Sequence, residues 1–321
     1  MDKRRVIYIV EWGIAIAACV WLVWKLATYE HYDIVAASLR AMGWKEWGAL
    51  ALALALMPVN MSLEAWRWRT LMNEGNELKN EGVNELTFKE AQRQVYYSKL
   101  AGLITPWRLG EYPARGLLMN GENGANGENG GIWPKVLSMG VVGSATMTAA
   151  IVGVGALALA FSEPVLKLLG DSYLYALVAV ILVLSVILYF APQALKKWVQ
   201  LNGTLVWKSI GQSAIRLTCW CAQLALVLLA LKGLALSDLS EVSVWLNMPI
   251  YYLLVTITPN VPIVEAGVRG AWAIAVFGTM NAALAGVLLW VINTLLPCII
   301  WLFIRKNAVT SARPFPFGTG S

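Results

Sequence analysis

Six apolar stretches of membrane-spanning length constrain the fold of this chain more than any other feature of its sequence. A helix needs about 20 apolar residues to cross a bilayer. The stretches run approximately over residues 6–27, 46–66, 132–161, 172–191, 212–231 and 281–304. Hydrophobic residues make up 58% and charged residues 14% of the 321 residues, against about 45–50% and about 25% in soluble domains. The sequence therefore predicts an all-α integral membrane protein with a single transmembrane domain, residues 1–321.

Two further apolar regions, 94–119 and 244–278, are interrupted by helix-breaking residues. They hold "ITPWRLGEYPAR" and "ITPNVPIVEAGVRGAW". Proline removes a helical hydrogen bond, and glycine allows another backbone or a ligand to come close. The predicted helix breaks are Pro106, Gly110, Pro113, Pro259, Pro262 and Gly267. Each region is either a pair of half-helices that enters the membrane and returns, or a source of full spans, which gives eight or more.

The distribution of positive charge favours the re-entrant alternative. With a cytoplasmic N-terminus, 14 Lys and Arg fall on the inside and 5 on the outside, which is a positive-inside bias. Both termini are then cytoplasmic, and residues 1–161 and 172–304 form inverted halves. Broken helices at matching positions of such halves mark transporter binding sites. The polar segments 73–86 and 120–131 are predicted to be flexible cytoplasmic loops, and 305–321 a short tail.

Five charged residues accompany the predicted breaks. A charge at the centre of a spanning helix costs about 2.5–3.5 kcal/mol, so these side chains need partners or a wet site. Helical spacing lets Glu111 pair with Arg108 or Arg115, and lets Glu265 pair with Arg269. One interpretation is that internal salt bridges hold the breaks together. The other, compatible with it, is a mid-membrane cavity that binds an anionic group, because arginine bonds two phosphate oxygens at once.

A second group of charges lies where the second predicted span ends, in "EAWRWRTLM". Arg67 and Arg69 can extend along apolar surface to reach the interface, as long basic side chains do at helix ends. The alternative for both arginines is contact with a lipid headgroup, and Lys99, just before the first break, is similarly placed. Glu64 is the expected carboxylate partner of these two arginines.

Several classes of site are disfavoured by composition. The only histidine is His31, and no cysteine pair has zinc-ligand spacing, so catalysis by histidine and a metal site are not expected. No phosphate-binding loop of the nucleotide-hydrolase type is present, and no cofactor is expected. The basic residues form no aromatic-interleaved patch, so nucleic acid is not an expected partner.

At the first break the sequence resembles a known family. "TPWRLGEYPAR" is similar to the Pro, Arg, Gly-Glu and Arg signature of the lysylphosphatidylglycerol synthase transmembrane region, a flippase-like family, and "RWRTLM" also fits it. "VEAGVRG" resembles the family's "PGGxGVRE" segment, but it has Gly270 in place of the Glu, and Glu265 in place of a Gly. The resemblance implies a stand-alone translocating module without the soluble synthase domain.

These observations lead us to expect a lipid flippase of a bacterial cytoplasmic membrane that is not an enzyme. Arg108, Arg115 and Arg269 would neutralise a lipid phosphate, and Glu111 and Glu265 would orient them or contact a cationic headgroup. One alternative is a non-catalytic membrane partner of an envelope or glycosyltransferase complex. Another is a membrane-embedded enzyme that acts on a lipid phosphate.

Overall fold

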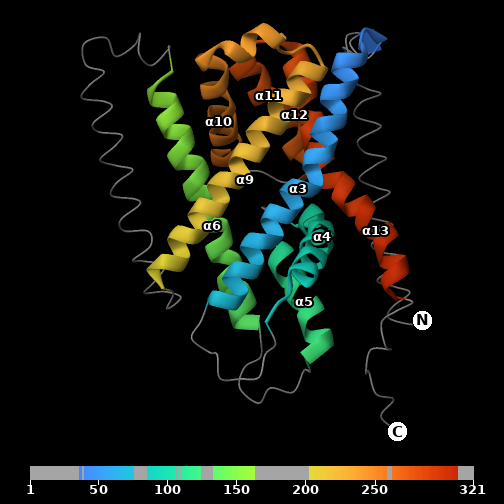
Figure 1. Cartoon of the computed structure of the whole chain (residues 1–321), viewed down its shortest axis with the longest axis vertical. Helices are drawn as coiled ribbons and strands as arrows, with labels where there is room; N and C mark the ends of the chain where they lie inside the picture. The colour runs from blue at the N-terminus through green and yellow to red at the C-terminus, as the bar shows by residue number, and fades with distance from the viewer. Residues whose placement is uncertain are drawn as a thin grey trace.

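The computed structural model describes residues 36–37, 40–75, 85–105, 108, 110–123, 133–162, 202–258 and 262–309, and within them all regular structure is helical (Figure 1). In chain order the elements are α3 (Trp44–Glu74), α4 (Phe88–Ile104), α5 (Glu111–Asn123), α6 (Trp133–Ala160), α9 (Gly203–Ala230), η3 (Leu236–Ser240), α10 (Val242–Ile257), α11 (Pro262–Phe277), α12 (Met280–Trp290), the π-helical turn η4 (Val291–Leu295) and α13 (Leu296–Val309).

Within the described residues, four helical segments are long and apolar enough to cross a membrane. They are Trp44–Glu74, Pro134–Ala160, Gly203–Ala230 and Met280–Phe303, the last of which joins α12, η4 and part of α13. Each coincides with a predicted span. The predicted spans 6–27 and 172–191 lie outside the described residues. Four apolar helices of this length indicate a membrane protein, as the composition predicts.

Two of these helices extend beyond their predicted bounds. α3 continues past residue 66 to Glu74, and α9 begins at Gly203 rather than at 212. In both cases buried polar side chains, such as Thr70 in α3 and Ser209 in α9, continue the helix where a search for apolar residues stops. The Asn202 side chain accepts a hydrogen bond from the Thr204 backbone N–H at 3.2 Å and caps α9, as asparagine does at many helix starts.

Each interrupted region forms two helices. α4 and α5 flank the first break and lie in the lower half of the molecule in Figure 1, whereas α10 and α11 flank the second and lie in the upper half. At the first break, Arg108 has a φ of 57°, a left-handed conformation that is uncommon for a residue with a side chain. The Gly110 backbone N–H donates to Thr105 Oγ1 at 2.8 Å. A Cβ at Gly110 would lie 2.8 Å from the Ala101 carbonyl oxygen, so the close approach requires glycine here.

Three of the residues predicted at the helix breaks lie in the helices that follow the breaks. Pro113 lies in the first turn of α5, Pro262 is the first residue of α11, and Gly267 lies inside α11. A first-turn residue has no intrahelical acceptor for its N–H, so proline is tolerated there and starts a helix rather than ending one. Pro106 and Pro259 lie outside the described residues.

The described ends of the predicted polar segments are helical, and residues 76–84, 124–131 and 310–321 lie outside the described residues. α3 includes residues 73–74, α5 includes 120–123, and α13 reaches Val309, because polar residues can continue a helix once its backbone hydrogen bonds are formed. The Asn73 side chain also donates to the Leu86 carbonyl at 3.0 Å and accepts from the Leu86 N–H at 2.9 Å. The segment predicted as a flexible linker is therefore pinned where it begins and ends.

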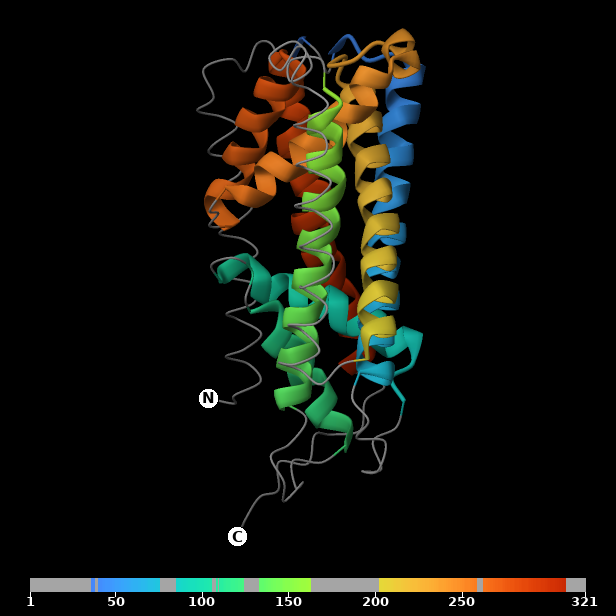
Figure 2. The same ribbon diagram turned by 90° about the vertical axis from the view of Figure 1, so that its left-hand side faces the viewer.

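The core lies along the contact between α3 and α9, which run side by side along the length of the molecule (Figure 2). Fully buried side chains at this core include Met61, Trp68, Leu224 and Leu228. α6 packs against α9 and α10, while α4 packs against α3 and α13. This packing brings polar side chains of α3 and α9 next to the first break.

Candidate functional site

The two helix breaks are joined by a salt bridge between residues 157 positions apart. Arg108 Nη2 lies 3.1 and 2.9 Å from the two carboxylate oxygens of Glu265. Arg269, one helical turn further along α11, donates from Nη2 to Glu265 Oε1 at 2.8 Å. The same Nη2 of Arg108 donates to Thr294 Oγ1, in the π-helical turn, at 2.7 Å. One carboxylate from the second break thus binds arginines from both breaks.

Glu64 of α3 is the centre of a larger cluster. Its carboxylate pairs with Lys99 of α4 at 2.9 Å, with Arg216 of α9 at 2.6 Å, and with Arg115 of α5. Glu64 is only 3% exposed. Leaving one buried charge without its partner costs about 3–5 kcal/mol, so this single carboxylate stabilises the packing of four helices.

Glu111 at the start of α5 connects the two clusters. Its carboxylate lies 2.9 Å from Lys99 Nζ, 3.5 Å from Arg115 Nη2 and 3.9 Å from Arg108 Nη1. A continuous chain of ion pairs therefore runs from Arg216 on α9 to Arg269 on α11. Gly102 lies against this carboxylate: a Cβ at that position would be 2.6 Å from Glu111 Cγ.

The buried charges do not balance among the described residues. Six basic side chains of the cluster are buried or half-buried, and only three carboxylates lie among them. The basic residues are Arg67, Lys99, Arg108, Arg115, Arg216 and Arg269, and the acidic residues are Glu64, Glu111 and Glu265. The described part of the cluster thus carries three positive charges in excess, which favours binding of an anion.

Arg67 contributes most directly to this excess. Its guanidinium donates from Nη1 to Ser213 Oγ on α9 at 2.7 Å, and the residue is only 7% exposed. Within the described chain it forms no ion pair with a carboxylate. The other five basic residues of the cluster each contact at least one.

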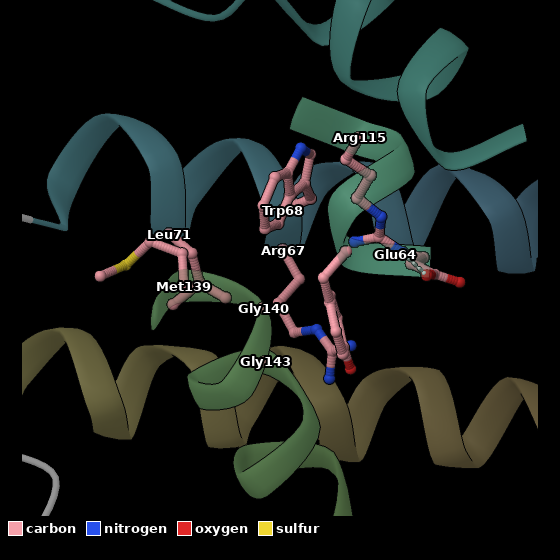
Figure 3. A pocket seen from close by; sticks show the side chains of 9 residues that line it. Glu64, Arg67, Trp68, Leu71, Arg115, Met139, Gly140 and Gly143 are labelled. Atoms are coloured by element: carbon pink, nitrogen blue, oxygen red, sulfur yellow. Dashed lines mark hydrogen bonds and ion pairs between the residues drawn. The ribbon is translucent and has the colours of Figure 1, made fainter. Parts of the chain in front are cut away.

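A small cavity lies beside Arg67, between α3, α5 and α6 (Figure 3). Its volume is about 20 Å³, enough for one water molecule. The residues lining it are Glu64, Arg67, Trp68, Leu71, Tyr112, Arg115, Met139, Gly140 and Gly143. The guanidinium of Arg115 also lies over the Trp68 ring, 4.9 Å from its centre. Figure 3 shows Arg115 reaching toward Glu64, while Arg67 extends away from it.

A chain of amide side chains leads from the cluster into the other half of the molecule. Arg216 Nε donates to Asn60 Oδ1 at 2.8 Å, and Asn60 Nδ2 donates to Asn293 Oδ1 at 2.7 Å. Asn293 Nδ2 then donates to Gln223 Oε1 at 3.0 Å. Asn293 lies in the π-helical turn next to Thr294, and such turns occur frequently at functional sites.

The structure confirms two of the predicted pairings and corrects a third. Glu111 contacts both Arg108 and Arg115, and Glu265 contacts Arg269. Glu64, however, pairs with residues of three other helices instead of with Arg67. The reason is geometric, because α4, α5 and α9 pack around Glu64 and bring Lys99, Arg115 and Arg216 to it.

Several residues of the cluster were missed by sequence reasoning. Arg216 is the clearest case, since a charged residue inside the predicted span 212–231 already signals a functional or paired position. Lys99, by contrast, carried a signal in its position just before the first break. The amides Asn60 and Asn293 and the hydroxyl of Ser213 carried none, because uncharged polar residues are common in membrane helices.

In the described part of the chain, no group of three or more His, Cys, Asp or Glu side chains is arranged to hold a metal ion. No protein-family model and no curated protein sequence matches this chain.

Proposed function

We propose that the protein is a lipid translocase that binds an anionic headgroup in the polar cluster between its helices. The observation that carries this proposal is the excess of three positive charges buried among the described helices. Uncompensated charge inside a membrane protein is costly and marks a pathway for substrate or ions. A lipid phosphate would offset part of this excess and would be released again, as transport requires.

The surroundings of the cluster suit a lipid better than a soluble anion. Large apolar side chains on the outside of α3, among them Leu52, Leu54 and Val59, are exposed and would face acyl chains in a bilayer. The headgroup would enter the cluster while the tails stay in the membrane. Membrane lipid, or a lipid-linked intermediate, is therefore the proposed partner.

In this proposal α4–α5 and α10–α11 are re-entrant pairs that enter the bilayer from opposite sides. The placement of the two pairs in opposite halves of the molecule (Figure 1) and the salt bridge between Arg108 and Glu265 support it. The positive-inside bias supports cytoplasmic termini, and the proposed location is a bacterial inner membrane. The sequence of the first break supports membership of the lysylphosphatidylglycerol synthase transmembrane-region family.

Transport would follow a concentration gradient or the membrane potential, since the sequence has no nucleotide-binding loop. A potential of 100 mV contributes about 2.3 kcal/mol per charge moved. An interior-negative potential would therefore assist outward movement of an anionic lipid. The same potential would oppose, by an equal amount, the outward movement of a lipid with a net positive headgroup, which Glu111 and Glu265 could contact.

The test is a leaflet-exchange assay with purified protein in vesicles that contain fluorescent phosphatidylglycerol. A membrane-impermeant quencher reports the fraction of label in the outer leaflet over time. We expect protein-dependent exchange, slowed about tenfold or more by Arg108→Gln, which removes a charge-assisted contact. The matched control is Arg69→Gln, an exposed arginine outside the cluster.

Absence of exchange for every lipid of a panel would contradict the proposal. Co-purification with a glycosyltransferase, together with no exchange, would favour the non-catalytic partner role. Chemical turnover of a lipid phosphate in detergent would favour an enzyme instead.

A further inference from the structure

The cavity beside Arg67 lies apart from the salt bridge between Arg108 and Glu265 that joins the two breaks, although Arg115, which the sequence also assigns to the phosphate, is among the residues that line it. At that salt bridge, Glu265 contacts both Arg108 and Arg269, so two positive charges are already partly neutralised. Arg67 keeps its charge without a carboxylate contact among the described residues, and its guanidinium still has donors beyond the one bound to Ser213. An arginine presents five N–H donors.

We infer that the Arg67 cavity is a phosphate-binding site, with Arg67 as its principal donor and Tyr112 as a second. This inference rests on the proposed function and deepens it, because it assigns the phosphate to one wall of the cluster. Ser213 positions Arg67: its Oγ accepts from the guanidinium at 2.7 Å and donates to the Ser209 carbonyl at 2.7 Å. That arrangement fixes the guanidinium without neutralising it.

The wall formed by α6 is adapted to hold an aromatic ring close to the helix. A Cβ at Gly140 would lie 2.4 Å from Tyr112 Cδ1, so only glycine lets the ring pack there. The Tyr112 hydroxyl and Ser144 Oγ are 2.6 Å apart, at an exposed position between α5 and α6. This hydrogen bond holds Tyr112, which lines the cavity, against α6.

In this proposal the described conformation is the closed form of the site. A volume of about 20 Å³ holds one water molecule, and a phosphate with four oxygens needs more room. Separation of the Tyr112 hydroxyl from Ser144 opens the gap between α5 and α6, and the freed hydroxyl becomes available to the phosphate. A lipid entering through this gap keeps its tails outside the bundle.

Binding is measured by native mass spectrometry on purified protein with three probes: phosphatidylglycerol, diacylglycerol and inorganic phosphate. We expect Arg67→Gln to weaken phosphatidylglycerol binding by about tenfold to a hundredfold, the effect of losing charge-assisted hydrogen bonds. Arg67→Lys keeps the charge but loses the planar fork, so binding recovers only in part. Arg69→Gln, on the same helix but exposed, leaves binding unchanged.

Ser144→Ala tests the site from its exposed edge, where a substitution does not disturb the buried charges. Removing the hydrogen bond that holds Tyr112 lowers the cost of opening, so phosphatidylglycerol binds roughly fivefold more tightly. This expected gain keeps the test informative if Arg67→Gln fails to fold. Weaker or unchanged binding in Ser144→Ala contradicts the closing role of Tyr112.

The three probes separate the sources of phosphate. Arg67-dependent binding of phosphatidylglycerol alone assigns the site to a lipid, and Arg67-dependent binding of inorganic phosphate as well shows that the site also admits the free ion. Equal binding of phosphatidylglycerol and diacylglycerol, or full binding in a folded Arg67→Gln variant, overturns the site. If the wild type exchanges lipid and Arg67→Gln binds lipid as the wild type does, this site is rejected and the proposed function stands. If binding depends on Arg67 but the protein exchanges no lipid, the site stands and the proposed function is rejected.

Discussion

The break between α4 and α5 and the break between α10 and α11 both follow an Ile-Thr-Pro sequence, yet their surroundings differ. Around the first lie one carboxylate and three basic side chains, which are Glu111 with Lys99, Arg108 and Arg115. Around the second lie one carboxylate and one arginine that contact each other, Glu265 and Arg269. The shared Ile-Thr-Pro motif therefore marks where the helix is interrupted, while the neighbouring residues determine the net charge around each break.

The difference extends to the helices that each break contacts. Lys99 and Arg115, which flank the first break, pair with Glu64 of α3. Glu64 also pairs with Arg216 of α9. At the second break, Glu265 forms a salt bridge with Arg108 of the first break. The first half thus supplies most of the positive charge, and the second supplies a carboxylate that holds one of those charges.

The largest expected difference between the two breaks is the side of the membrane that each pair of helices faces. In a background without native cysteines, we expect Glu85→Cys, just before α4, to react with an impermeant maleimide only after the cells are permeabilised. Ser237→Cys, in η3 before α10, should react in intact cells. Both positions are exposed, and labelling of both from one side would exclude entry from opposite sides.

Neutralising the two central carboxylates should have unequal effects on stability. Glu64→Gln leaves Lys99, Arg115 and Arg216 without a shared buried partner, and we expect a loss of about 3–5 kcal/mol. Glu265→Gln should cost less, because Arg108 keeps its hydrogen bond to Thr294 and is partly exposed. Unfolding by a denaturing detergent in mixed micelles measures both, and equal losses would contradict the asymmetry.

The matching glycines provide a test that does not change any charge. At Gly110 a new Cβ would lie 2.8 Å from a backbone oxygen, whereas at Gly267 nothing lies within 4 Å. We expect Gly110→Ala to destabilise by about 1–3 kcal/mol through overpacking. Gly267→Ala, inside α11, should stabilise by about 0.5–1 kcal/mol through helix propensity. The same unfolding assay compares them, and a stabilising Gly110→Ala would show that the first break is not tightly packed.

The smallest expected effect is the coupling across the two halves. A double-mutant cycle of Arg108→Gln and Glu265→Gln should give an interaction energy between about 0.5 and 3 kcal/mol, as for residues in direct contact. The matched control pairs Arg69→Gln with Glu265→Gln, which share no contact and should be additive. Additive losses in the Arg108 cycle would mean that the two breaks do not stabilise each other.

The ion pairs within a single helix could be predicted from the sequence. Glu111 with Arg115, and Glu265 with Arg269, are four residues apart on one helix, so helical geometry alone brings them together. Local sequence does not show on which side of a break Pro113, Pro262 and Gly267 lie, and the structure places them in the helices that follow. Proline and glycine indicate that a break is near, but whether they end one helix or start the next depends on the residues before them.

The sequence by itself determined that the chain is an apolar helical protein, that its helices break in two places, and that charges lie beside both breaks. These properties depend on residues within a few turns of one another. The tertiary structure decided which charges meet: Glu64 pairs with α4, α5 and α9, Arg108 pairs with Glu265, and Arg67 contacts a hydroxyl instead of a carboxylate. The physical reason is that ion pairs between helices depend on how those helices pack, and the apolar residues that direct this packing can pair in many ways.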